Sequence, residues 1–311
     1  MTKKITLLLL FIPLINFAQL PVSKIVVFDL KKTSRSYAIS NPTTIKTSGG
    51  YTNQPYFNID GEKLYFVGNT KKNNKTDIYV YDFSKKRHQI KQLTKTKNES
   101  EYSPQISPEE NLISCVRVEK DTTIQHFFHY NLKGKNPKNI LPSLKTIGYY
   151  SWLGRNEFIT FNVPEPFYLM HYMLQPFSAD TLAENIGRCV LYTKNKNRIT
   201  YVDKSDTLHW KIKILNQKRY SRRKNMEQLA QDETITETLA GSEDYCFLPN
   251  GAILMGKDGI IYQKKQALTH PNNEWEVWAD LSAYKINDFY RIVISPNYQR
   301  LALVVFEGKK P

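Results

Sequence analysis

The repeated unit of this chain first appears at residues 54–67, which read QPYFNIDGEKLYFV. Residues 103–116, SPQISPEENLISCV, have the same form: a short strand pattern, a turn and a second alternating strand pattern. The turn chemistry explains the reversal, because Asp60-Gly61 suits a tight turn and Pro108 is followed by acidic residues and Asn111. Both stretches are therefore predicted to be β-hairpins.

The same hairpin pattern returns along the rest of the chain. Further copies lie at residues 152–158, 247–253 and 294–301, with a weaker copy at 192–199. One apolar residue is expected to mark the second strand of each copy: Leu64, Leu112, Phe158, Ile199, Ile253 and Leu301. Their spacings of 48, 46, 41, 54 and 48 residues lie slightly above the period of about 40–45 residues in WD-type propeller blades. Six copies at this period predict a six-bladed β-propeller.

A third strand is expected after each hairpin, and residues 78–83, 126–132 and 208–214 show its pattern. The start of the chain, residues 24–30, matches this third strand rather than the first. The last copy ends after its second strand, residues 301–306. Because the two fragments complement each other, we expect the last blade to combine N-terminal and C-terminal strands, which closes the ring.

The composition fits an all-β fold. The 311-residue chain is 41% apolar and 13% aromatic, with 20 Tyr and 15 Phe, and aromatic residues are enriched in strands. A mean hydropathy of -0.50 excludes a polytopic membrane protein. Three widely spaced cysteines exclude a disulfide framework and a zinc ribbon. We expect residues 19–311 to form one propeller domain, with a polar insertion at 216–237 that includes a short helical segment near 226–231.

The N-terminus has the pattern of a secretory signal peptide. Lys3 and Lys4 precede an apolar run at residues 5–15, and Ala18 supplies a small residue for cleavage. The run is too short for a comfortable transmembrane span, although an uncleaved anchor is the alternative interpretation. We predict that residues 1–18 are removed and that the mature chain, without a transmembrane span, is periplasmic or secreted.

The chain is basic, with a formal net charge of +15, or +13 once Lys3 and Lys4 are removed. A basic balance often indicates nucleic acid or an anionic surface as the partner, but export argues against nucleic acid. Most lysines are scattered in predicted turns, where they protect sheet edges. The one dense basic cluster, residues 218–224, is expected to be a solvated loop or a contact for anionic lipid or polysaccharide.

These hairpins resemble the WD-like repeats of TolB-type β-propellers. That family has a Phe-Ser-Pro-Asp-Gly core between the first two strands; residues 58–61 and 294–297 keep most of it, and residues 107–110 depart from it at the Gly. The resemblance covers roughly residues 24–306, and the chain is also similar to exported single-propeller proteins of that superfamily without an assigned activity. It implies protein or ligand binding in the cell envelope rather than catalysis, on an analogy of fold alone.

The first strand of each propeller blade lines the central channel, so the residues that enter these strands should gather at one mouth. Eight of them are predicted to bind a small ligand or a partner peptide: Gln54, Glu101, Tyr102, Tyr149, Arg188, Glu243, Asp244 and Arg291. Arg binds carboxylate or phosphate through a bidentate fork, and packed carboxylates can hold a hard cation. The alternative interpretations are Arg–carboxylate pairs that join adjacent blades, and a metal site.

No catalytic motif is recognisable. The sequence lacks the hydrolase motif Gly-x-Ser-x-Gly and the zinc motif His-Glu-x-x-His. The six histidines fall in predicted third strands or turns, and the three cysteines lie in or beside apolar strands, as expected of packed residues. The four tryptophans, including Trp152, are expected to pack between blades.

We therefore expect a non-catalytic binding or scaffold propeller that engages an envelope protein or a small ligand as a monomer, with no cofactor and no metal. The alternative is a propeller enzyme, a lyase or hydrolase that acts on glycan or lactone at the channel mouth. A third hypothesis, binding of extracellular polysaccharide, rests only on the tryptophans and the basic cluster.

Overall fold

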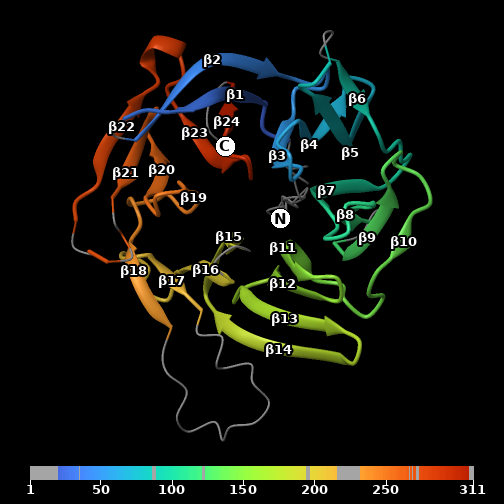
Figure 1. The fold of residues 1–311 in the computed structure, drawn as a ribbon. Coiled ribbons are helices and arrows are strands. Elements are labelled where there is room, and N and C mark those ends of the chain that lie inside the picture. The colour runs from blue at the N-terminus through green and yellow to red at the C-terminus, as the bar shows by residue number, and fades with distance from the viewer. Residues whose placement is uncertain are drawn as a thin grey trace, which may run out of the picture.

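The computed structural model describes residues 20–307 apart from 35, 86–88, 121–122, 194–196, 216–231, 266, 268 and 271–272. The described strands form six four-stranded antiparallel sheets, arranged as blades around a central axis (Figure 1). The predicted six-bladed, all-β propeller is thus confirmed. The expected signal peptide, the basic cluster and the expected helical segment near 226–231 lie outside the described residues. No helix in the described part of the chain is long and apolar enough to cross a membrane.

Five blades are continuous in sequence. Blade 1 contains β3 (Thr52–Phe57), β4 (Lys63–Thr70), β5 (Asn73–Asp82) and β6 (Ile90–Gln92). Blade 2 contains β7 (Ser100–Ile106), β8 (Leu112–Val118), β9 (Gln125–Asn131) and β10 (Lys138–Asn139). Blade 3 contains β11 (Ile147–Gly154), β12 (Glu157–Asn162), β13 (Tyr168–Leu174) and β14 (Phe177–Glu184). Blade 4 contains β15 (Ile186–Thr193), β16 (Arg198–Asp203), β17 (Lys211–Ile214) and β18 (Glu233–Glu237). Blade 5 contains β19 (Tyr245–Phe247), β20 (Ile253–Lys257), β21 (Ile260–Lys264) and β22 (Glu276–Asp280).

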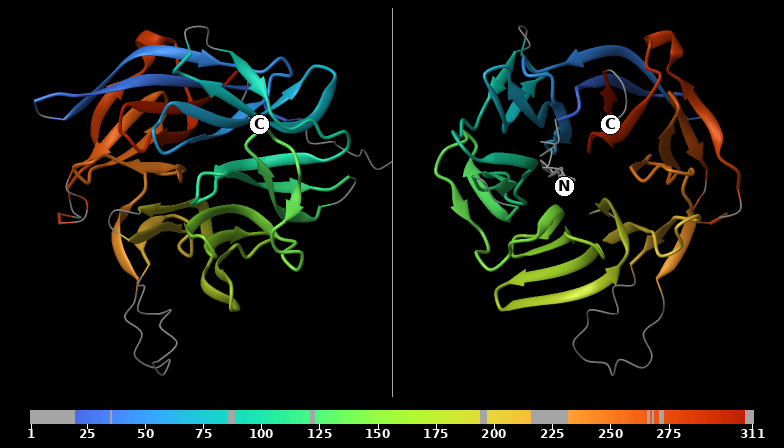
Figure 2. Two further views of the ribbon diagram at one scale, coloured as in Figure 1. Left: turned by 45° about the vertical axis from the view of Figure 1, so that its right-hand side comes forward. Right: turned by 180° about the vertical axis from the view of Figure 1, so that it is seen from behind.

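Blade 6 joins the two ends of the chain, as predicted. It is built from β23 (Phe289–Ile294), β24 (Arg300–Phe306), β1 (Ser23–Lys32) and β2 (Tyr37–Ile45). Strand β1 pairs with β24 so that Ile25 lies opposite Val304 and Val27 opposite Ala302. The blue strands thereby complete a sheet begun by the red ones (Figures 1 and 2). Closure leaves no end blade uncovered.

Apolar contacts between neighbouring blades hold the ring together. Leu254 and Ile261 of blade 5, for example, share a buried cluster with Phe28 and Leu303 of blade 6. Most second strands are accordingly buried at consecutive positions, as in β4 and β24. A strand covered on both faces can be apolar along its whole length, which explains the continuous apolar runs in these segments.

The hairpin register corrects one of the predicted second-strand markers. Equivalent strand pairs near the turns of the six hairpins are Phe57–Leu64, Ile106–Ile113, Trp152–Phe158, Tyr192–Ile199, Phe247–Ile253 and Ile294–Leu301. All six markers lie in second strands, but in blade 2 the position equivalent to the other five is Ile113, one residue after Leu112. Leu112 closes the turn instead, because its N–H donates to the Ser107 hydroxyl at 3.2 Å and its carbonyl accepts from the Ser107 N–H at 2.9 Å.

Two of the three predicted third strands, now β5 and β9, lie where the sequence placed them. Strand β17 begins at Lys211, later than the predicted start at residue 208. The Asp206 carboxylate explains the difference, because it accepts hydrogen bonds from the backbone N–H groups of Leu208 and His209 at 3.0 and 3.1 Å. These bonds hold the segment in a turn.

Candidate functional site

The hairpin register defines equivalent positions in the six first strands. Five of these strands change register near their start, and such bulges re-aim side chains out of the regular ladder. Three residues before the first-strand member of each equivalent strand pair lie Gln54, Ser103, Tyr149, Cys189, Asp244 and Arg291. Four residues before it lie Asn53, Tyr102, Gly148, Arg188, Glu243 and Tyr290. Seven of the eight predicted site residues occupy these two levels, and Glu101 does not.

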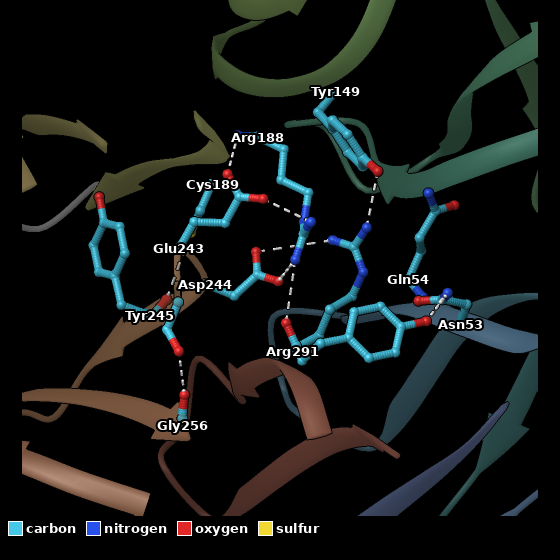
Figure 3. Close-up of polar contacts among 12 residues, drawn as sticks. Asn53, Gln54, Tyr149, Arg188, Cys189, Glu243, Asp244, Tyr245, Gly256 and Arg291 are labelled. Carbon is cyan, nitrogen blue, oxygen red and sulfur yellow. Dashed lines mark hydrogen bonds and ion pairs between the residues drawn. The ribbon is translucent and has the colours of Figure 1, made fainter. Parts of the chain in front are cut away.

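Four charged side chains converge where blades 4, 5 and 6 meet (Figure 3). We call Arg188, Glu243, Asp244 and Arg291 the mouth cluster. Arg188 reaches from blade 4 to both carboxylates: Nη1 lies 2.6 Å from Glu243 Oε1, and Nη2 lies 2.6 Å from Asp244 Oδ2. Lys204 adds a third cation, with Nζ 2.8 Å from Glu243 Oε2. Short charge-assisted contacts of this kind fix the orientation of each carboxylate.

Arg291 brings the second guanidinium from blade 6. Its Nη2 donates to the Tyr149 hydroxyl of blade 3 at 2.8 Å. Its Nη1 lies 4.0 Å from Asp244 Oδ1. The guanidinium also lies over the rings of Tyr149 and Tyr290, at 5.2 and 5.8 Å from their centroids. The cluster and its phenols therefore bring together residues of blades 3 to 6.

Both guanidiniums are partly buried, with the Arg188 and Arg291 side chains 27% and 14% exposed. Burial works to lower the pKa of Arg188, but Asp244 and Glu243 outweigh it and the pKa is raised. Burial also works to lower the pKa of Arg291, but Tyr149 and Asp244 outweigh it and the pKa is raised. Both side chains are therefore held in the charged form.

Two other predicted mouth residues, Gln54 and Tyr102, contact adjacent blades, and so does Asn53, which precedes Gln54. Gln54 Oε1 accepts a hydrogen bond from the Ser103 N–H of blade 2 at 2.8 Å. The Asn53 amide donates to the Tyr290 hydroxyl of blade 6. Tyr102 packs against the apolar cluster of blades 2 and 3. Figure 3 shows the Arg291 guanidinium between Glu243 on one side and Gln54 and Asn53 on the other. Gln54 and Asn53 therefore lie at the same mouth as the mouth cluster.

Tyr51 is a mouth residue that sequence reasoning missed. Burial raises the pKa of the Tyr51 hydroxyl. The neighbouring phenols of Tyr290, Tyr149 and Tyr102 raise this pKa further, whereas the Arg291 charge lowers it. These interactions place the Tyr51 hydroxyl among the mouth residues. Because Tyr51 precedes the hairpin motif of blade 1, no repeat position could have identified it.

A cavity of about 330 Å³ adjoins the mouth cluster. All four cluster residues line it, together with the aromatic side chains of Trp210, Phe289, Tyr290 and Phe306. Its volume lies at the lower end of the range for small-molecule sites, about 300–1,000 Å³.

Glu101 does not lie with the other predicted mouth residues. Its side chain is fully buried beside Asp77, where Oε1 accepts the Tyr130 hydroxyl at 2.9 Å and Oε2 accepts the Thr96 hydroxyl at 3.0 Å. Burial raises its pKa to about 7, with a further contribution from the Asp77 charge. The one-residue error at Leu112 explains the misplacement, because the corrected register puts Tyr102, not Glu101, level with the mouth residues.

Other predicted chemistry is structural. The three cysteines are free and buried. Trp152 packs between blades as predicted, and its Nε1 donates to the Ser114 hydroxyl of blade 2 at 2.8 Å. Within the part of the chain that the structure describes, no group of three or more His, Cys, Asp or Glu side chains is arranged to hold a metal ion.

Six four-stranded blades closed by β1 and β24 define a six-bladed β-propeller, and its solved structural neighbours include TolB-like propellers. The chain is similar to a putative TolB from Agrobacterium tumefaciens, with a TM-score of 0.61 and 12% identity over 93% of this chain and 99% of that one. It is similar to TolB from Acinetobacter baumannii, with a TM-score of 0.54 and 14% identity over 92% of this chain, and it spans 65% of that protein. A chain of a nidogen/laminin complex gives a TM-score of 0.54 at 9% identity, over 91% of this chain and 98% of that one. No family model and no curated protein matches the sequence. The predicted resemblance to TolB-like propellers is confirmed at the level of the fold.

Proposed function

We propose that this protein is an exported, non-catalytic binding propeller of the periplasm or cell envelope, which holds a protein partner or a small ligand at one mouth of its central channel. The mouth cluster carries the proposal. Two guanidiniums and two carboxylates from three blades converge beside a cavity of about 330 Å³. A cavity with a few convergent polar groups is the usual form of a ligand site.

Export is supported by the signal-peptide pattern at residues 1–18. The similarity of fold to two bacterial TolB structures agrees with an envelope role. Residues 19–311 are then the mature chain, acting as a monomer with one propeller domain.

The mouth cluster also joins blades, but it differs from a purely structural ion pair. Arg188 stays 27% exposed and lines the cavity together with both of its carboxylate partners. Contact with solvent screens and so weakens ion pairs, so a cluster built for stability alone gains nothing from this opening. An opening does serve a site that must admit a ligand.

The experiment is capture from cell-envelope extract by the mature protein, with metal analysis of the same sample. Replacing Arg188 and Glu243 together by Ala removes one cation and one anion, so the net charge is unchanged. We expect the double variant to keep its near-UV circular dichroism spectrum and to lose the partner or ligand that the wild-type protein retains.

The matched control is the pair Arg155 and Glu109, whose Nε and Oε1 lie 3.2 Å apart in the hairpin turns of blades 3 and 2. Their double Ala variant should bind as the wild-type protein does. Unfolding of the Arg188/Glu243 variant, or equal capture by both double variants, would show that the cluster only joins blades. A tightly held cation without a partner would favour the enzyme alternative.

A further inference from the structure

Of the cations at the mouth, Arg291 has the weakest carboxylate pairing. Three cations, Arg188, Lys204 and Arg291, surround Glu243 and Asp244. Arg188 and Lys204 already engage both carboxylates at 2.6–2.8 Å. Asp244, at 4.0 Å, is the one described carboxylate paired with Arg291. Arg291 is therefore the cation of this group without a close carboxylate partner among the described residues.

Arg291 also has unused hydrogen-bond donors. A guanidinium has five N–H groups. Within the described chain, one of those on Arg291 donates, from Nη2 to the Tyr149 hydroxyl. The Nε atom is buried without a partner, and 4.0 Å to Asp244 is too long for a hydrogen bond. Unsatisfied buried donors are unfavourable, so an acceptor that binds here gains from this arrangement.

One phenol beside Arg291, that of Tyr149, can donate to the same acceptor. The Tyr149 hydroxyl accepts from Arg291, which leaves its own O–H without an acceptor among the described residues. A guanidinium with a hydroxyl donor beside it is well suited to an oxyanion.

The cavity gives a small ligand access to this group. Arg291 lines it, and the rings of Trp210 and Phe306 lie on the same walls as the polar residues Ser242 and Lys257. Mixed aromatic and polar walls suit a polar ligand of modest size.

We propose that Arg291 binds the carboxylate group of a small, singly charged ligand in this cavity. The inference rests on the proposed binding function and names the chemistry of its ligand. A carboxylate brings a single negative charge to Arg291. The cavity wall already holds four carboxylates, those of Glu243, Asp244, Asp258 and Asp288, and they would repel a phosphomonoester with close to two charges more strongly. The planar carboxylate also matches the guanidinium fork.

Two pairs of probes test the proposal, because the members of each pair share a body and differ in the carboxylate. They are D-glucuronate with D-glucose, and N-acetyl-dialanine with its C-terminal amide. We expect at least one acid to raise the melting temperature by about 2 °C or more and its neutral counterpart to have no effect. The responding pair tells a sugar acid from a peptide terminus. No response to either acid, or equal responses to acid and neutral probe, would overturn the proposal.

Variants locate the effect at Arg291. Titration calorimetry of the responding acid should show about a 10-fold or greater loss of affinity in Arg291→Met, and Arg291→Lys should restore it only in part. Wild-type affinity in Arg291→Met would contradict the proposal. If Arg291→Met does not fold, Tyr149→Phe serves instead, with an expected loss of a few-fold and unchanged affinity as the contrary result.

Arg300→Met is the matched control. Arg300 also lies in blade 6, its side chain is 15% exposed, and it pairs with Glu62 in blade 1, outside the cavity lining. Its removal should leave acid binding unchanged. If Arg291→Met captures the same envelope partner as the wild-type protein, the binding function stands and the carboxylate inference falls.

Discussion

The mouth cluster and the Asp77–Glu101 pair both bury carboxylates between blades, but they stabilise them differently. In the mouth cluster, Glu243 and Asp244 meet cations at 2.6–2.8 Å. Glu101 accepts from the Tyr130 hydroxyl at 2.9 Å and has no ion pair among the described residues. Hydroxyl donors offset burial less well than a cation does, and burial accordingly raises the pKa of Glu101 to about 7.

This difference separates a structural joint from a candidate binding site. A protonated Glu101 can remain buried with hydroxyl partners and needs no ligand. Arg291 stays charged, keeps unused donors and lines a cavity. A ligand can therefore accept hydrogen bonds from the unused donors of the mouth cluster, whereas the Glu101 carboxyl already has hydrogen-bond partners within the protein.

Removing Asp244 should have the largest effect on stability. Asp244→Ala leaves Arg188 and Arg291 beside each other without their shared carboxylate, and breaking a buried pair from one side costs about 3–5 kcal/mol. Urea unfolding at pH 7 measures the loss. Glu233→Ala, an exposed carboxylate on β18, should cost less than about 0.5 kcal/mol. A similar small cost for Asp244→Ala would mean that the cluster is not electrostatically coupled.

Glu101→Gln should stabilise the protein, and only at higher pH. The folded-state pKa of Glu101 is raised from 4.5 to about 7, so the wild-type protein loses stability as the pH rises between these values, while the unfolded chain releases its proton first. The variant avoids that loss and should gain up to about 3 kcal/mol above pH 7 and nothing below pH 4.5. Urea unfolding across this range measures the gain, and parallel pH profiles would contradict it.

Tyr130→Phe should destabilise the same region to a smaller extent. The variant removes the hydroxyl that donates to Glu101, at a cost of about 1–2 kcal/mol. Because that bond lowers the pKa of Glu101, the midpoint of the pH profile should also move upward. A loss of stability without a shift of the midpoint would show that Tyr130 acts through packing alone.

Lys204→Met should have the smallest effect. Lys204 pairs with Glu243 at 2.8 Å and lies over the Trp210 ring at 3.8 Å, but its side chain is 25% exposed. We expect a cost of less than about 1 kcal/mol that shrinks further at high salt. A cost above about 2 kcal/mol, measured by urea unfolding, would place Lys204 with Asp244 as an essential member of the cluster.

Most of the fold could be predicted from the sequence because its information is local. Turn residues such as Asp60-Gly61 and the short apolar run at residues 64–67 identify hairpins without knowledge of their partners. The match between residues 24–30 and the third strands even predicted closure of blade 6. Strands β13 and β14 were not identified, because Pro164, Pro166 and Pro176 interrupt the pattern there.

The candidate site could be predicted only in part. Counting back from the hairpins placed Arg188, Glu243 and Asp244 correctly, since the register is nearly constant from blade to blade. The same counting misplaced Glu101, because a single-residue shift in one turn moves every residue before it. Which guanidinium has close carboxylate partners depends on the packing of distant segments and has no local signal.

The most direct test compares Arg291→Met with Glu101→Gln, two variants that each remove one buried charged group. Mature wild-type protein and both variants are recovered from the same envelope extract, and their retained ligands and partners are identified by mass spectrometry. We expect the wild-type protein and Glu101→Gln to retain the same ligand or partner, and folded Arg291→Met to retain none. Retention by Arg291→Met, together with loss from Glu101→Gln, would contradict the assignment of the mouth cluster as the binding site.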